Sequence, residues 1–144
     1  MDITQDELDV MIKEHKLVGI DWRGMNLVGA YLRYADMRGS NLSEADLSYA
    51  TFWDTDLSHA NLGGAHLFGA YALDNVSLRG ANLNGAWMSR ARLRGVDFTG
   101  ADMRNADLSF ADLNEFNLSN TDLTGSNTVL LTFLRANTNG MKLG

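Results

Sequence analysis

Almost the whole chain repeats with a period of five residues. In a typical unit, Ala45-Asp46-Leu47-Ser48-Tyr49, a small residue is followed by a polar residue and then by a large apolar one. An α-helix repeats every 3.6 residues and a strand every two, so neither element alone keeps the large residues on one side. The pattern instead predicts a coil that turns a corner every five residues. One small and one large side chain of each unit then point inward.

The large residues mark the centres of 25 units, which fall into two registers. The first register ends at Leu67 and the second begins at Leu73. The two registers are offset by one residue, and the slip lies within residues 70–73. We therefore expect Tyr71 or Ala72 to bulge out of the wall of the coil, as the extra residue of a β-bulge does.

The pattern weakens near the C-terminus. Thr128 and Thr138 replace apolar centres, while Val129, Leu130 and Leu134 fall on outward positions. Either the last coil departs from the repeat, or a second chain covers its end. Exposed apolar patches often mark interaction sites.

Length and composition narrow the class of protein. The 144 residues fit one domain, and 45% of them are apolar, too many for a disordered chain of this charge. The absence of Cys excludes a disulfide framework and cysteine-based zinc sites. No apolar run is long enough to span a membrane, and residues 1–16 lack the apolar core of a signal peptide, so we expect a cytoplasmic protein without a membrane partner.

The tandem units resemble the pentapeptide-repeat family, whose motif is A(D/N)LxX, over residues 20–143. The resemblance implies an all-β fold, a right-handed quadrilateral parallel β-helix of about six coils. Some members of this family inhibit or protect DNA gyrase by imitating duplex DNA with an acidic rod, and they dimerise through their C-terminal ends. The shared motif is structural, so no functional residue carries over. A DNA-mimicking modulator of DNA gyrase or another topoisomerase is therefore the alternative function.

Residues 1–19 precede the repeat and contain a predicted helix over 4–16. Thr4 and Glu7 form a capping-box pattern before an apolar stripe, and Gly19 is the expected stop. A β-helix has an open strand edge at each end, and an amphipathic helix can cover one of them. We therefore interpret this segment as a cap, with a partner-binding helix as the alternative.

One side of the predicted coil is apolar on its outer surface. Every fourth unit stacks on the same side, so the units centred near residues 27, 47, 67, 88, 108 and 128 share it. We call its outward residues the aromatic side: Tyr49, Phe68, Trp87, Phe110, Val129 and Leu130. Aromatic residues are enriched at interface cores, which favours a protein partner or a homodimer. The alternative is a ladder that only stabilises the coils.

No motif points to chemistry. His15, His59 and His66 are scattered and have no second ligand beside them, and no catalytic triad, P-loop or dinucleotide-binding loop is present. We expect no enzymatic activity, no metal and no cofactor. A basic belt at 79–104 interrupts the acidic chain, whose net charge is −6. Pairing of these arginines with nearby Asp is favoured over a nucleic-acid platform at Trp87 and Arg90, so nucleic acid is not an expected partner.

Overall fold

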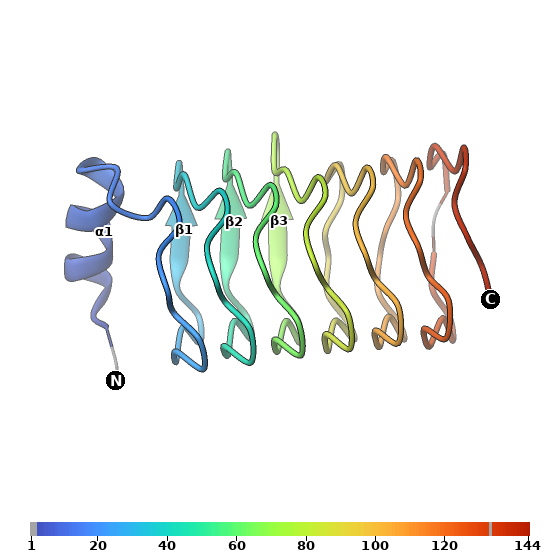
Figure 1. Cartoon of the computed structure of the whole chain (residues 1–144), viewed down its shortest axis with the longest axis horizontal. Helices are drawn as coiled ribbons and strands as arrows, with labels where there is room; N and C mark the ends of the chain where they lie inside the picture. The colour runs from blue at the N-terminus through green and yellow to red at the C-terminus, as the bar shows by residue number, and fades with distance from the viewer. Residues whose placement is uncertain (1–2, 133) are drawn as a thin grey trace.

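The chain forms a β-helix with a short helix at its N-terminal end (Figure 1). The computed structural model describes residues 3–132 and 134–144. Helix α1 spans Gln5–Lys13, and strands β1 (Tyr31–Arg33), β2 (Thr51–Trp53) and β3 (Tyr71–Leu73) form one parallel sheet in that order. The remaining coils are joined by isolated parallel bridges. The predicted β-helix with an N-terminal helix is confirmed.

The bridges give the size of one coil. Asp21 pairs with Asn41, Asn41 with Asn61, and Asn61 with Asn82. Stacked residues are thus 20 positions apart in the first coils and 21 apart where an extra residue intervenes. Four units of five residues make one coil. The amide side chains of this column form a ladder, in which Asn82 Nδ2 donates to Asn61 Oδ1 at 2.9 Å.

The polar residue before each centre shapes the turn. Its side chain accepts a hydrogen bond from the amide two residues later, as Asp46 Oδ1 does from Ser48 N–H at 3.0 Å. The corner that follows has a left-handed backbone, which suits glycine or asparagine. Strands β1 to β3 have Tyr31, Thr51 and Tyr71 at that position.

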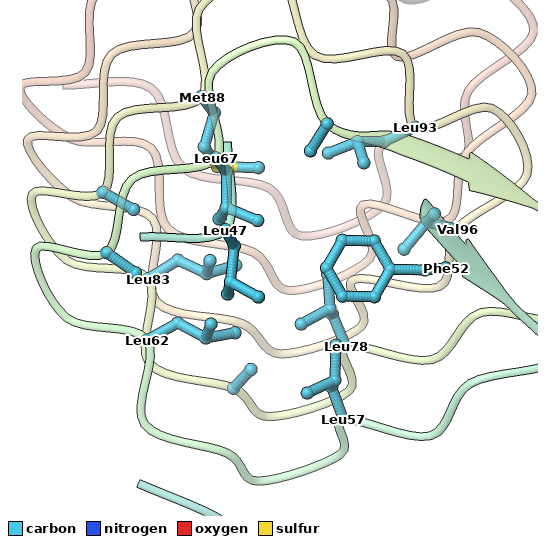
Figure 2. Close-up of a cluster of buried hydrophobic side chains, with 14 of the residues drawn as sticks. Leu47, Phe52, Leu57, Leu62, Leu67, Leu78, Leu83, Met88, Leu93 and Val96 are labelled. Atoms are coloured by element: carbon cyan, nitrogen blue, oxygen red, sulfur yellow. The ribbon is translucent and has the colours of Figure 1, made fainter. Parts of the chain in front are cut away.

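The interior of the rod is filled by the centre residues and the small residues beside them. Figure 2 shows Leu47, Leu67 and Met88 stacked from successive coils. The rings of Phe98 and Phe116 pack at 5.4 Å between centroids. Thr121 is buried too, and its hydroxyl donates to the Phe98 carbonyl at 2.9 Å. The fill of side chains agrees with the inward positions predicted from the repeat.

The extra residue lies at a corner, in Asp74-Asn75. Both residues have a left-handed backbone, with φ of 31° and 47°, where other corners have one such residue. The Asp54 amide donates to the Asp74 carbonyl at 3.0 Å, and Asn75 Nδ2 donates to Asp54 Oδ1 at 2.7 Å. Two residues of this coil therefore face one residue of the coil before it, as in a β-bulge.

The expectation that Tyr71 or Ala72 bulges within 70–73 is wrong. Ala72 is buried and pairs with Phe52, so it is the inward residue of its unit, and Leu73 is not. The error arose because Ala72 is small and Leu73 beside it is large. The additional residue is accommodated at the corner formed by Asp74 and Asn75, where no side chain points into the core.

Helix α1 covers the first coil. Both hydrogen bonds of the predicted capping box are present: Glu7 N–H donates to Thr4 Oγ1, and Thr4 N–H donates to the Glu7 carboxylate. Leu8 is buried against the end of the rod. The helix ends at Lys13, several residues before the expected stop at Gly19, because His15 already takes a left-handed backbone with φ of 53°.

The last coil keeps the repeat over its described residues. Asn127, Thr132 and Asn137 pair with the coil before them. The suggestion that this coil departs from the pattern is therefore wrong for these residues. The predicted centre Phe133 lies outside the described part of the chain.

Candidate interaction surface

The aromatic side projects from the wall of the rod. Trp87 is 60% exposed, and Tyr49, Phe110 and Val129 are exposed to a similar degree. Leu130 is 68% exposed, whereas Phe68 is half-buried. All six predicted interaction residues thus lie outside the core, on coils that follow one another along the rod.

Neighbouring coils share part of this surface. The rings of Tyr49 and Phe68 meet edge to face at 5.5 Å, and Trp87 packs on His66 at 5.2 Å. The Tyr49 ring also lies across Gly69, where an added Cβ would be 2.9 Å from Tyr49 Cε1. Tyr49 and Phe68 therefore form a ring contact within the aromatic side, and Tyr49, Trp87 and Phe110 are each more than half exposed.

A second aromatic cluster lies on β1 and β2. The Arg33 guanidinium carbon lies 4.1 Å from the ring centroid of Trp53 and 5.6 Å from that of Tyr34. Arg33 was not among the residues that the sequence singled out. The available signal was the spacing, because Arg33 and Trp53 are one coil apart and pair across the sheet.

Three of the five arginines of the basic belt form ion pairs with described carboxylates. Arg79 pairs with Asp97 at 2.8 Å and Arg104 with Asp102 at 2.6 Å, as expected for these two arginines. The hydrogen bond from Arg104 is the main reason that the pKa of Asp102 is lowered. Arg94 pairs with Glu115 of the next coil at 2.8 Å, and the pKa of this carboxyl is also lowered, chiefly by that hydrogen bond. Paired arginines of this kind do not form a continuous basic platform.

The described part of the chain has neither a metal-binding cluster nor a membrane-spanning helix. Residues 3–132 and 134–144 hold no cluster of three or more His, Cys, Asp or Glu side chains that could hold a metal ion. Over the same residues, no helix has the length and apolar character needed to cross a membrane. Two of the histidines have packing partners, since His66 stacks on Trp87 and the His59 ring lies across Gly80.

The repeat units carry the relationship to known proteins. The family model described as pentapeptide repeats matches the sequence in eight copies, over residues 16–43, 35–71, 73–109 and 101–127. The chain belongs to the pentapeptide-repeat family. A comparison with curated proteins finds no match. Membership therefore rests on the repeat itself, which the family uses as a structural scaffold.

Several solved pentapeptide-repeat structures are similar to this one. QnrB1, described as a plasmid-mediated fluoroquinolone resistance protein, is 23% identical; the match covers 86% of this chain and 79% of that one, with a TM-score of 0.41. Rfr23 from the cyanobacterium Cyanothece 51142 is 23% identical over 96% and 94% of the two chains, with a TM-score of 0.43. A pentapeptide-repeat protein from the thylakoid lumen of Arabidopsis thaliana is 27% identical over 88% and 67%, with a TM-score of 0.28.

Proposed function

We propose that this pentapeptide-repeat protein is a non-catalytic, cytoplasmic scaffold that binds a protein partner, or a second copy of itself, through the aromatic side and the C-terminal end. The scaffold would be a right-handed quadrilateral β-helix of about six coils. The observation that carries the proposal is the run of half-exposed rings and aliphatic side chains on successive coils of one side. Large exposed apolar strips of this kind are typical of interaction surfaces.

The last coil extends this surface around the end of the rod. Leu134 is 72% exposed, and Leu143 and Leu130 are exposed as well. Exposed apolar side chains gathered in one region favour contact with another polypeptide.

Sedimentation velocity can test self-association. The double change Trp87→Asp with Phe110→Asp should dissociate a dimer and leave the circular dichroism unchanged, because neither side chain lies in the core. A matched control, Asn120→Asp with Thr124→Asp, adds the same charge on other sides and should remain a dimer. If the parent protein is a monomer at every concentration, self-association is wrong. The same variants then test capture of a protein partner.

The second candidate is a DNA-mimicking modulator of DNA gyrase. It is favoured by the net charge of −6 and by carboxylates stacked on successive coils, as in the bridge pairs Asp36–Asp56 and Asp102–Asp122. The similarity to QnrB1, a fluoroquinolone resistance protein, supports the same candidate. Arg38 and Arg104, which pair with Asp36 and Asp102, reduce the exposed negative charge and weigh against it. A supercoiling assay with and without the protein tests it, and unchanged gyrase activity would contradict it.

A further inference from the structure

A groove lies where the end of helix α1 meets the first coils. It has a volume of about 680 Å³, within the range of small-molecule sites. Its walls combine helix residues with residues of β1 and the corner after it: Gln5, Asp9, Ile12, Lys13, His15, Tyr31, Arg33 and Tyr34. Tyr31 and Tyr34 are each 59% exposed, so their rings are available to a ligand. The groove is thus both aromatic and basic.

Arg33 is held in place on one wall. Its guanidinium stacks on Trp53 at 4.1 Å, and Tyr34 lies on the same cation at 5.6 Å. Stacking restrains the plane of the guanidinium but does not use its N–H groups. A guanidinium fixed in this way can donate two parallel hydrogen bonds to a carboxylate or a phosphate at a lower entropic cost.

The charge of this groove is not balanced by the chain itself. Eight of the 12 basic side chains form ion pairs with described carboxylates. Lys13 and Arg33 are not among them. The one acidic lining residue, Asp9, accepts a hydrogen bond from Gln5 Nε2 at 2.7 Å. Two cations therefore face the groove without a described carboxylate partner.

A second polar groove, in the described part of the rod, shows the contrast. It lies beside β3 and is lined by Arg92 and Arg94 together with Asp112 and Glu115. Arg94 there is already bound to Glu115 at 2.8 Å, and with Asp74 the lining carboxylates outnumber the arginines by three to two. An anion would gain little in that groove. Arg94 is therefore a suitable control residue for Arg33.

We propose that the groove between α1 and β1 binds a small organic anion that carries a planar ring. Its phosphate or carboxylate group would accept hydrogen bonds from Arg33 and Lys13, and its ring would stack on Tyr31 or Tyr34. Lys13 also stabilises the C-terminal end of α1 through the helix dipole. That role does not account for Arg33, which lies on β1 and stacks on a side chain of the next coil. The proposed site is independent of the aromatic side and of the C-terminal end.

Nuclear magnetic resonance titration of the full-length protein tests this site. The probes are adenosine monophosphate, phenylacetate, adenosine and inorganic phosphate, and the signals followed are Arg33 Nε and the Trp53 indole. We expect saturable shifts of both signals with at least one of the two ring-bearing anions. Adenosine and inorganic phosphate should each bind at least roughly tenfold more weakly, because each lacks one of the two recognised parts.

Variants separate binding from helix stabilisation. Arg33→Gln and Lys13→Gln should each weaken the binding of the anion by roughly tenfold or more, whereas Arg94→Gln should leave it unchanged. The thermal midpoint of Arg33→Gln should stay close to that of the parent. Phenylacetate as the only ligand would assign the anion as a carboxylate, and the monophosphate alone as a phosphate. No saturable shift with either ring-bearing anion, or equal binding to Arg33→Gln, would overturn the site.

Discussion

The two ends of the rod differ in how far their apolar side chains and strand edges are covered. At the N-terminal end, α1 places Leu8 over the first coil, and this side chain is only 1% exposed. At the C-terminal end, the last described coil leaves Leu134 72% exposed. Figure 1 shows the helix at one end and the bare coil at the other.

The contrast extends to the backbone. The Gln5 side chain takes the place of a missing strand beside β1, because its Oε1 accepts from Tyr31 N–H at 2.9 Å and its Nε2 donates to the Tyr31 carbonyl at 3.0 Å. A cap therefore needs both an apolar cover and a partner for the edge. Neither is seen in the described residues of the last coil.

Removing the cap should have the largest effect. Deletion of residues 1–17 exposes the edge of β1 and the inward Trp22, so we expect aggregation or association of edges. Size-exclusion chromatography with light scattering measures it. The parent protein, measured under the same conditions, is the control. A monodisperse and equally stable protein without residues 1–17 would show that α1 is not a cap.

The next largest effect is the difference in stability lost when Leu8 or Leu143 is replaced by Ala. Leu8→Ala should lower the free energy of unfolding by about 2–5 kcal/mol, because it opens a cavity under the helix. Leu143→Ala removes a side chain that is mostly exposed and should cost less than about 0.5 kcal/mol. Urea denaturation of both variants gives the two values. Equal losses would mean that the two ends are packed alike.

A smaller effect concerns the edge of β1. Gln5→Ala removes both hydrogen bonds to Tyr31 and should lower the free energy of unfolding by about 1–3 kcal/mol. Amide hydrogen exchange should become faster at Tyr31 and stay unchanged at Leu42 in the next coil. Unchanged exchange at Tyr31 would show that water satisfies the Tyr31 N–H and carbonyl as well as the Gln5 side chain does.

The smallest effect depends on pH. The backbone amide and hydroxyl of Thr4 donate to Glu7 and lower the pKa of this carboxyl from its ordinary value of 4.5. A lowered pKa in the folded state means that the contribution is present above pH 4.5 and is lost as the pH falls below that value. Glu7→Gln should therefore lose less stability than the parent between neutral and acidic pH, measured by urea denaturation. Parallel pH profiles would contradict a contribution from Glu7.

The sequence predicted the repetitive part of this fold well. Units such as Asp46-Leu47 carry both the inward side chain and the turn-forming acceptor, so the wall follows from local chemistry. Ala72 lies five residues after Leu67, so the spacing of the first register already gives its inward position, and the larger Leu73 beside it hid this. The stacking of Arg33 on Trp53, by contrast, depends on side-chain conformations that spacing alone does not determine.

The aromatic side could be listed from the spacing of the units, but the depth of each ring could not. Phe68 is half-buried while Trp87 on the following coil is exposed, although both are outward residues of the same side. The two rings occupy different positions in their units, because Phe68 follows its centre Leu67 and Trp87 precedes its centre Met88. Each ring has an aromatic neighbour, Tyr49 for Phe68 and His66 for Trp87, so a ring contact alone does not set how much of an outward ring is exposed.

The bulge at Asp74-Asn75 also bears on how such a chain can vary in length. One residue inserted at a corner leaves every later side chain on its original side, as the bridge from Asp56 to Ser77 shows. Loss of a whole five-residue unit would instead rotate everything downstream by a quarter turn and break up each column of side chains. Loss of four units would shorten the rod by one coil and keep its columns of side chains aligned. Mutations that alter the length of the chain are therefore tolerated in steps of one residue at a corner or of twenty along the wall, and a step of five, the period of the sequence itself, is the disruptive one.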